Sequence, residues 1–370
     1  MATARISTLT RFRLALCLLC VAPLTMAAED YRIDTLAEGL DHPWSLAFIG
    51  DGRMLITEKA GRLFLLDAQG QRLTRVEGVP AVFDKSQGGL FEVLPAPDFA
   101  DSGMLYLSYA HGDAQANATR LLRARLQGDR LVEGEVIFTA EPTKDTPVHY
   151  GGRMCWRGDG TLMLGLGDGF DYREAAQALD SHLGTLVRLN PDGSIPQDNP
   201  FVGRAGSLAA IYSYGHRNVQ GLYCDGDAVW AHEHGPRGGD ELNRIEPGGN
   251  YGWPVATHGI DYSGARISPY TEIEGMRDPM VHWTPSIGPS ALTRYAGDRF
   301  PDWQGDFFVA TLVEPGARRL QMRDGAVVAQ QRLLEALGTR IRDIRSGPDG
   351  ALYVLTDGAD AALHRILPAD

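Results

Sequence analysis

The sequence lacks the motifs that mark several common enzyme classes. It has no Gly-rich dinucleotide-binding fingerprint between a strand and a helix, no phosphate-binding P-loop and no Gly-x-Ser-x-Gly elbow. Nicotinamide-dependent oxidoreduction and serine hydrolysis therefore have no support in the sequence.

The sequence has little helical periodicity and few cysteines. Short apolar runs alternate with Gly, Pro, Asp and Asn, and 44 of the 370 residues are glycine, which predicts an all-β fold with tight turns. Beyond residue 27 no segment reaches about 18 uninterrupted apolar residues, so no membrane insertion is expected there. Only Cys155 and Cys224 lie beyond that point. They either form a disulfide or stay as buried apolar side chains.

The N-terminus differs from the rest of the chain. Arg5, Arg11 and Arg13 precede the apolar run LALCLLCVAPL, and small residues follow at Ala27 and Ala28. This pattern predicts a cleaved signal peptide over residues 1–27, and hence a periplasmic or secreted protein. Cleavage would remove basic residues and no acidic ones, so the formal net charge of −12 becomes more negative. An acidic surface argues against nucleic acid or an anionic membrane as a partner.

One unit recurs along the chain: an apolar run, a turn, a second apolar run and a polar residue. Copies begin at Trp44, Leu90, Arg153, Gly221, Ser290 and Ile341. The clearest three contain an Asp-Gly pair, which suits a two-residue hairpin with φ > 0 at both positions. Six units predict one domain over residues 28–370, a six-bladed β-propeller of four-stranded antiparallel blades. The strand near 31–33 is expected to close the last blade.

The segments between the units are long, and loops of this kind are usually functional. They span 143–153, 170–217 and 234–289. His149 lies in the first, and Asp168 ends the hairpin that follows. Together they suit a general base and the carboxylate that orients it, although a structural histidine and a turn aspartate fit equally well. Residues 168–182 have the composition of a short helix.

Two pairs of polar residues suit an anionic ligand. Arg217 and Asn218 follow the run IYSY and present paired donors to a planar polyanion. Arg340 and Arg342 share one side of a strand, where they are able to clamp two carboxylates. The alternatives are a surface arginine and a solvated edge strand.

The loop around Gly235 carries the densest cluster of polar residues. His232, Glu233 and His234 suggest zinc, but neighbours along a strand point to opposite faces and no third soft ligand follows. A Gly/Pro-rich loop with carboxylates suits Ca²⁺ better because Ca²⁺ binds carbonyl and carboxylate oxygens. A plain acidic loop remains the alternative.

Ten motifs occur in a characteristic order: HPWSLAF, QGGL, HYGGR, LGDG, SHLGTLVRLN, YGHRNVQG, EHGPRGGDELN, GGNYGWP, PSIGPS and RIRDIRSGPDGALY. With them, nearly the whole chain beyond residue 27 resembles the aldose sugar dehydrogenase branch of the soluble quinoprotein sugar dehydrogenases. That resemblance implies a periplasmic six-bladed propeller that uses pyrroloquinoline quinone (PQQ) and Ca²⁺ to oxidise aldoses to lactones. It also implies an external electron acceptor, and we expect a monomer.

The resemblance implies a role for each candidate residue. His149 takes the proton from the anomeric hydroxyl, and Asp168 orients it. Gln87 and Arg217 contact the reacting groups. The residues implied to bind PQQ are Gln87, Arg217, Asn218, Tyr262, Ser286, Arg340 and Arg342. The implied calcium ligands are the carbonyls of Gly235 and Pro236 for one ion, and Glu241 with the carbonyl of Tyr251 for a second.

One departure from the family pattern concerns a lysine on the fifth blade. Some members carry it after the strand that here reads FFVATL, where this chain has Val313-Glu314-Pro315. Arg318 and Arg319 are the candidates to replace it. A non-catalytic propeller with a decayed cofactor site is therefore one alternative.

A calcium-dependent lactonase is the other alternative. It would need an axial metal ringed by carboxylates, for which Glu58, Asp168, Glu233 and Asp357 are candidates because each follows a hairpin strand. Such a lactonase would leave Arg217 and the Arg340/Arg342 pair unexplained.

Overall fold

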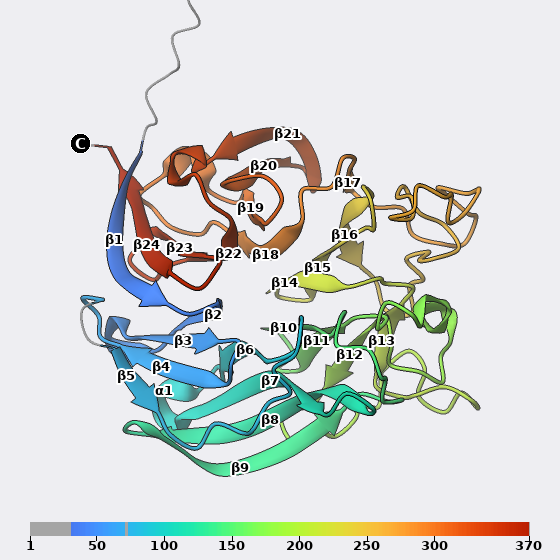
Figure 1. Cartoon of the computed structure of the whole chain (residues 1–370), viewed down its shortest axis with the longest axis horizontal. Helices are drawn as coiled ribbons and strands as arrows, with labels where there is room; N and C mark the ends of the chain where they lie inside the picture. The colour runs from blue at the N-terminus through green and yellow to red at the C-terminus, as the bar shows by residue number, and fades with distance from the viewer. Residues whose placement is uncertain (1–30, 71–72, 370) are drawn as a thin grey trace, which may run out of the picture.

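The computed structural model describes residues 31–70 and 73–369, and its strands form six four-stranded antiparallel sheets arranged as a ring (Figure 1). The predicted six-bladed propeller is confirmed. The predicted signal peptide lies outside the described residues. Among the described residues, no helix is long and apolar enough to cross a membrane.

Each blade runs from an inner strand to an outer one. Blade 1 holds β2 (Pro43–Phe48), β3 (Met54–Glu58), β4 (Arg62–Leu66) and β5 (Leu73–Val76). Blade 2 holds β6 (Leu90–Pro95), β7 (Met104–Gly112), β8 (Asn117–Gln127) and β9 (Arg130–Thr139). Blade 3 holds β10 (Gly151–Trp156), β11 (Leu162–Leu166), β12 (Thr185–Leu189) and β13 (Ile211–Tyr214).

The second half of the ring repeats the pattern. Blade 4 holds β14 (Val219–Asp225), β15 (Ala228–Glu233), β16 (Asp240–Ile245) and β17 (Val281–Trp283). Blade 5 holds β18 (Pro289–Arg294), β19 (Phe307–Thr311), β20 (Ala317–Arg323) and β21 (Ala326–Leu333). Blade 6 holds β22 (Ile341–Ser346), β23 (Leu352–Thr356), β24 (Ala361–Pro368) and β1 (Tyr31–Leu40).

The ring closes as the sequence predicts, because β1 pairs antiparallel with β24. The inner strands contact their neighbours in a continuous circuit that runs from β2 through β22 and back to β2. Helical segments are short: α1 (Phe99–Ser102) and the 3₁₀ turns 50–52, 173–177, 301–303 and 335–337. The turn at 173–177 confirms the short helix expected within 168–182.

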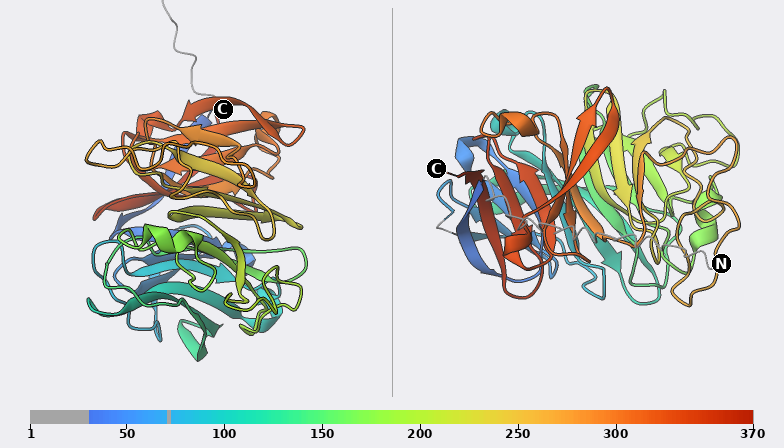
Figure 2. Two further views of the ribbon diagram at one scale, coloured as in Figure 1. Left: turned by 90° about the vertical axis from the view of Figure 1, so that its right-hand side faces the viewer. Right: turned by 90° about the horizontal axis from the view of Figure 1, so that it is seen from above.

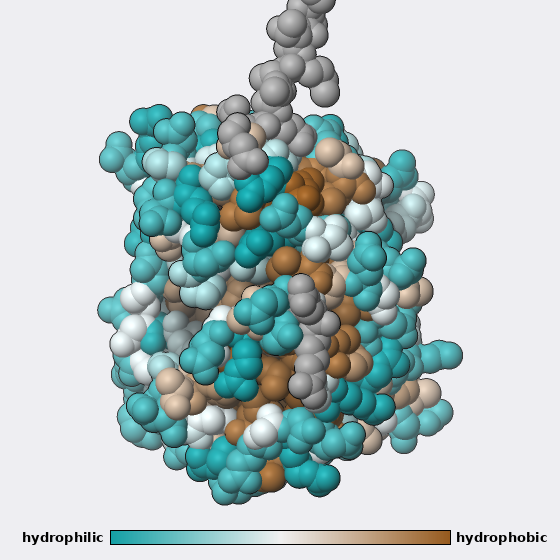
Figure 3. Space-filling model, turned by 90° about the vertical axis from the view of Figure 1, so that its left-hand side faces the viewer, coloured by the Kyte–Doolittle hydropathy of each residue, from teal (hydrophilic) through white to brown (hydrophobic). Residues whose placement is uncertain are grey.

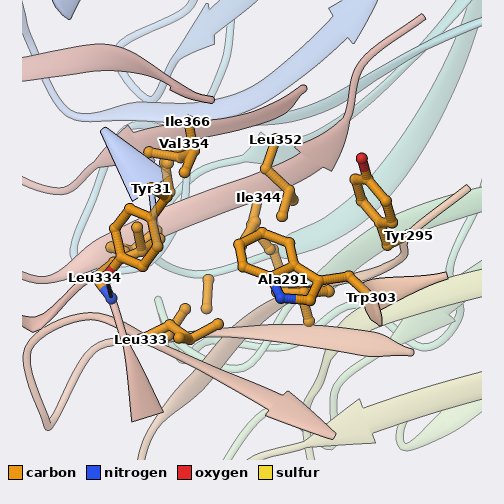
Figure 4. Close-up of a cluster of buried hydrophobic side chains, with 14 of the residues drawn as sticks. Tyr31, Ala291, Tyr295, Trp303, Leu333, Leu334, Ile344, Leu352, Val354 and Ile366 are labelled. Carbon is orange, nitrogen blue, oxygen red and sulfur yellow. Dashed lines mark hydrogen bonds between the residues drawn. The ribbon is translucent and has the colours of Figure 1, made fainter. Parts of the chain in front are cut away.

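The apolar core lies between adjacent blades. Figure 4 shows one cluster, in which Tyr31 of β1 and Trp303 contribute rings beside Val354 and Ile366 of blade 6. Because no blade can bury both of its faces alone, the ring stabilises all six together. A side of the propeller seen edge-on mixes apolar and polar residues (Figure 3).

The hairpin turns differ from the prediction at two of the three Asp-Gly pairs. Asp51 and Gly52 both have φ > 0, as expected. Asp159 and Asp349 do not. Their carboxylates instead accept hydrogen bonds from the backbone N–H two residues on, at 2.9 and 3.1 Å. This local side-chain bond favours a different turn, in which only the glycine needs a positive φ.

Cys155 of β10 and Cys224 of β14 form a disulfide that joins the inner strands of blades 3 and 4. The long loops that follow β11 and β16 gather at one side of the ring, and the view from above shows them flanking blades 3 and 4 (Figures 1 and 2).

Candidate functional site

The predicted site residues gather at one edge of the ring. In an antiparallel blade, the start of the inner strand and the end of the second strand meet at the same edge. Gln87, His149 and Arg217 precede inner strands, and Arg340 precedes β22. Asp168 follows the second strand of blade 3. Residues far apart in sequence therefore share a face because of the propeller topology.

His149 and Asp168 form a buried pair. The Nδ1 of His149 lies 2.6 Å from Oδ1 of Asp168, and both side chains are almost fully buried. The same oxygen accepts from the Phe170 N–H at 2.8 Å, and Oδ2 accepts from the indole N–H of Trp253 at 2.7 Å. Three donors hold the carboxylate in one orientation, so the predicted orienting role of Asp168 has a geometric basis.

The environment keeps His149 neutral. Burial lowers its pKa, and the charges of Arg217 and Lys144 lower it further, while the hydrogen bond and charge of Asp168 oppose the shift. With the proton on Nδ1 facing Asp168, the lone pair is on Nε2. No described residue forms a hydrogen bond with Nε2. The arrangement leaves one ring nitrogen available to accept a proton.

A cavity of about 1140 Å³ opens at this edge of the ring. Seven predicted residues line it: Gln87, Gly235, Pro236, Tyr262, Ser286, Arg340 and Arg342. His149 is not part of that lining. Its neighbours Tyr150 and Gly151 are, and its backbone N–H donates to the side-chain oxygen of Gln87 at 2.9 Å. The histidine thus lies directly behind the cavity wall.

The two arginines of blade 6 share one carboxylate. Asp357 lies 3.1 Å from the Nε of Arg340 and 2.9 Å from an Nη of Arg342. Arg342 is largely buried, whereas Arg340 is 56% exposed. The two arginines therefore lie together at the cavity as expected, with one of their two positive charges compensated within the protein.

Arg217 lines a second cavity of about 280 Å³ and is not part of the lining of the large one. Its guanidinium donates to the carbonyls of His234 and Gly235, the latter at 2.9 Å, and to the hydroxyl of Tyr262 at 3.3 Å. Tyr262 and Pro236 line both cavities. The guanidinium thus reaches the large cavity only through Tyr262, which borders both cavities.

The side chains of Asn218 and Ser286 form hydrogen bonds within the protein that stabilise neighbouring segments. The side-chain oxygen of Asn218 accepts from the Gly151 N–H at 3.2 Å, and Asn218 does not line the large cavity. Ser286 donates to Asp240 at 2.6 Å. Asp240 also accepts from the backbone N–H groups of Gly235, Ile287 and Gly288, and so fixes the Gly235–Pro236 loop against blade 5.

Glu241 is a buried carboxylate without a cationic partner among the described residues. Burial raises its pKa well above the usual range, and the charge of Glu233 adds to the shift. The side-chain oxygen of Asn243 is buried and has no hydrogen-bond partner within the described part of the chain. Glu241, Glu233 and Tyr251 line a small cavity. An unpaired carboxylate and an unpartnered oxygen fit a cation of Ca²⁺ type.

Neither Arg318 nor Arg319 takes the place of the missing lysine of blade 5. Arg318 pairs with Glu314, and Arg319 pairs with Asp306 at 2.7 Å. Neither lines the large cavity, whereas Val313 does. Lys59 of blade 1 lines that cavity, with its Nζ 2.6 Å from Asp84.

The centre of the ring is occupied by a guanidinium. Arg153 of β10 donates to carbonyls of Trp44, Gln220, Ser290 and Arg342, which belong to four other blades. The carboxylates proposed for an axial lactonase metal are engaged elsewhere: Glu58 with Arg62, Asp168 with His149, Glu233 with His216 and Asp357 with Arg342. The lactonase alternative therefore gains no support.

Sequence reasoning missed four residues at the site. Trp253 and Asp240 hold predicted site residues in place, Gln220 lines the large cavity, and Lys144 lines a small cavity with His149. Trp253 and Asp240 lie in motifs noted above, NYGWP and EHGPRGGDELN, but their partners Asp168 and Ser286 are too distant in sequence to be inferred from one chain. Gln220 and Lys144 follow no pattern that distinguishes them from other polar residues.

The model of the family "Glucose / Sorbosone dehydrogenase" matches residues 40–365. The chain is 40% identical over 360 residues to aldose sugar dehydrogenase YliI of Escherichia coli strain K12, covering 95% of this chain and 97% of the relative.

Solved structures give the same result. A crystal structure of a glucose dehydrogenase superposes with a TM-score of 0.88 at 44% identity, covering 92% of this chain and 100% of that one. The PQQ-bound form of an aldose sugar dehydrogenase from Streptomyces coelicolor superposes with a TM-score of 0.75 at 29% identity, covering 91% and 98% of the two chains.

Proposed function

Because the chain belongs to the glucose/sorbosone dehydrogenase family, and is therefore an oxidoreductase that acts on sugar CH–OH donors, we propose that it oxidises aldoses at the anomeric carbon to lactones with PQQ and Ca²⁺. One observation carries this proposal. A neutral histidine, oriented by a carboxylate and with one unengaged ring nitrogen, lies behind a cavity lined by arginines.

His149 acts as the general base. An aldose hydroxyl is a poor hydride donor until it loses its proton, and Nε2 of His149 is the group that accepts that proton. Asp168 stabilises the imidazolium that forms, and Trp253 and the Phe170 N–H keep Asp168 in place. Gln87 fixes the His149 backbone from the cavity side.

The cavity residues fit PQQ, a planar quinone that carries three carboxylates. When bound, PQQ supplies the electrophilic carbon that accepts the hydride. Arg340 and Arg342 would hold carboxylates, and Arg217 would donate to an oxygen on which negative charge develops. Tyr262, Ser286 and Asn218 remain candidates for further contacts.

Different structural features support the two proposed calcium sites. At the first, the carbonyls of Gly235 and Pro236 would be the ligands, in a loop that Asp240 holds at the cavity edge. At the second, Glu241 and the Tyr251 carbonyl would bind the ion, whose charge would compensate the buried carboxylate. The first ion would lie beside the cofactor and the second would stabilise the loop.

We further propose that residues 28–370 act as one catalytic domain, monomeric and periplasmic or secreted after loss of residues 1–27. The electrons would then leave through an external acceptor.

The test is reconstitution. Apoprotein given PQQ, Ca²⁺ and glucose should reduce a dye, and His149→Ala should lower kcat by about 10²–10⁴-fold, the usual contribution of a general base, while PQQ binding is retained. His364→Gln, on β24 of blade 6, is the matched histidine control and should leave turnover unchanged. An active His149→Ala variant would refute the role of the base. Wild-type protein that stays inactive at saturating PQQ would refute the proposed reaction.

A further inference from the structure

Lys144 lies buried behind the His149–Asp168 pair. Its Nζ donates to the side-chain oxygen of Asn117 at 2.9 Å and to the Thr146 carbonyl, and it lies 3.5 Å from the centroid of the Tyr150 ring. Only 3% of the residue is exposed. No described carboxylate forms an ion pair with it. A lysine in such a place is uncommon, because an ammonium is rarely buried without a counter-ion.

The contacts of Lys144 stabilise both of the segments that carry His149 and Asp168. The Tyr150 hydroxyl, one residue after His149, donates to the same Asn117 oxygen at 2.6 Å. The Thr146 hydroxyl donates to the carbonyl of Gly169, one residue after Asp168, at 2.6 Å. A Cβ added at Gly169 would lie 2.7 Å from Cδ of Lys144, so the lysine stem packs directly against that turn.

The charged groups around Lys144 are few. Asp168 and Asp145 favour its charged form, while burial is the larger effect and lowers its pKa to about 7. His149 and His182 line the same small cavity as Lys144. His182 is neutral near pH 7, because burial lowers its pKa to about 4.

The remaining neighbours do not supply a counter-ion. Asp145 accepts a hydrogen bond from the Tyr172 hydroxyl at 2.7 Å. Tyr150 stays protonated, because burial raises its pKa above the usual range. Arg217 acts on His149 in the same direction as Lys144 does: each positive charge disfavours the imidazolium.

We propose that Lys144 is a positioning residue that fixes the loop bearing His149 and whose ammonium, when present, weakens His149 as a proton acceptor. Loss of the lysine proton then strengthens the base without moving any contact to substrate. This inference rests on the proposed role of His149 as the base. It predicts two levels of turnover, separated by the titration of a group that touches neither sugar nor cofactor.

The first test needs no cofactor. The sequence has three lysines, Lys59, Lys85 and Lys144, so a ¹³Cε-lysine spectrum of the whole apoprotein is simple to assign with Lys144→Arg. The Lys144 signal should titrate near pH 7. Titration of Lys144 above pH 9 would overturn the proposal.

The second test follows the His149 imidazole by NMR, with His149→Gln to assign its signal. In Lys144→Met the His149 pKa should rise, because a positive charge that lowers it has been removed. In Lys144→Arg it should stay low at every pH, since arginine does not lose its proton. An unchanged His149 pKa in Lys144→Met would overturn the proposal. If that variant does not fold, wild type and Lys144→Arg decide, because only wild type should show a second step near pH 7.

Turnover supplies the third test. With PQQ, Ca²⁺ and saturating glucose, wild-type kcat should rise a second time near pH 7, and Lys144→Arg should lack that rise. A purely structural role predicts that arginine restores the wild-type profile at all pH values. Wild-type protein that shows both NMR titrations but no dye reduction would refute the proposed function and leave the link between Lys144 and His149 standing.

Discussion

Two regions of the propeller contain buried charged side chains, and they differ in how these charges are compensated. At the ring centre, Arg153 lies 3.2 Å from Asp343 and 3.7 Å from Glu92, and Arg345 pairs with both of those carboxylates. The face of Trp44 covers the Arg153 guanidinium at 4.0 Å. Two cations and two anions thus balance within the protein.

At the site edge the balance is incomplete. Lys144 has only neutral partners, and Glu241 has another carboxylate, Glu233, as its charged neighbour. The side-chain oxygen of Asn243 has no hydrogen-bond partner in residues 31–70 and 73–369. The buried charges at the ring centre are compensated within the protein, whereas Lys144 and Glu241 at the site edge have no ion-pair partner among the described residues and depend on a proton or an ion from solvent.

The largest effect is expected at the ring centre. Arg153→Met should lower the free energy of unfolding by about 3–5 kcal/mol, because it leaves buried carboxylates undercompensated. Urea unfolding measures the change, and Arg53→Met, which removes an arginine with an exposed partner, should cost less than about 1 kcal/mol. Equal losses in the two variants would remove the distinction between the ring centre and the surface.

A smaller effect is expected at Glu241. Ca²⁺ at 100 times the Kd of the Glu241 site should raise the free energy of unfolding by about 2.7 kcal/mol through that site. Glu241→Gln should lose most of this contribution, because the amide provides no negative charge. Thermal unfolding with Ca²⁺ and with a chelator measures both values. Glu246→Gln, at an exposed carboxylate paired with Arg277, is the control. A calcium gain equal to that of the wild type in Glu241→Gln would place the ion elsewhere.

The smallest effect is expected at Asp357. Asp357→Asn should tighten PQQ binding by up to about tenfold, or about 1.4 kcal/mol, because Arg340 and Arg342 no longer share their charge with a carboxylate. Asp225→Asn, which removes the partner of the distant Arg294, should not change the affinity. Fluorescence titration gives the Kd values. Weaker binding in Asp357→Asn would mean that the carboxylate orients the arginines more than it neutralises them.

The fold was predictable because its signals are local. Period-two apolar runs and Asp-Gly turns define strands and hairpins within about 25 residues, and the repeat then gives the ring. The predicted conformation of the turns at Asp159 and Asp349 was wrong. A hydrogen bond from the backbone to each Asp carboxylate outweighed the preference of the Asp-Gly pair for a two-residue hairpin turn.

The site was predictable in part. His149 and Asp168 stood out once the motifs were considered together, and the structure places them in contact. Arg153 and Lys144 did not stand out, because their importance arises from partners such as Ser290 and from burial. No local sequence pattern indicates that several carbonyls surround the Arg153 guanidinium, or that few carboxylates lie near the Lys144 ammonium.

Calorimetric titration of the apoprotein with PQQ decides whether this propeller holds the cofactor. We expect one PQQ bound per chain, tighter binding with Ca²⁺ than with a chelator, and a clear loss of affinity in Arg342→Ala. Absence of binding heat, together with an unchanged melting temperature at saturating PQQ and Ca²⁺, would contradict this expectation.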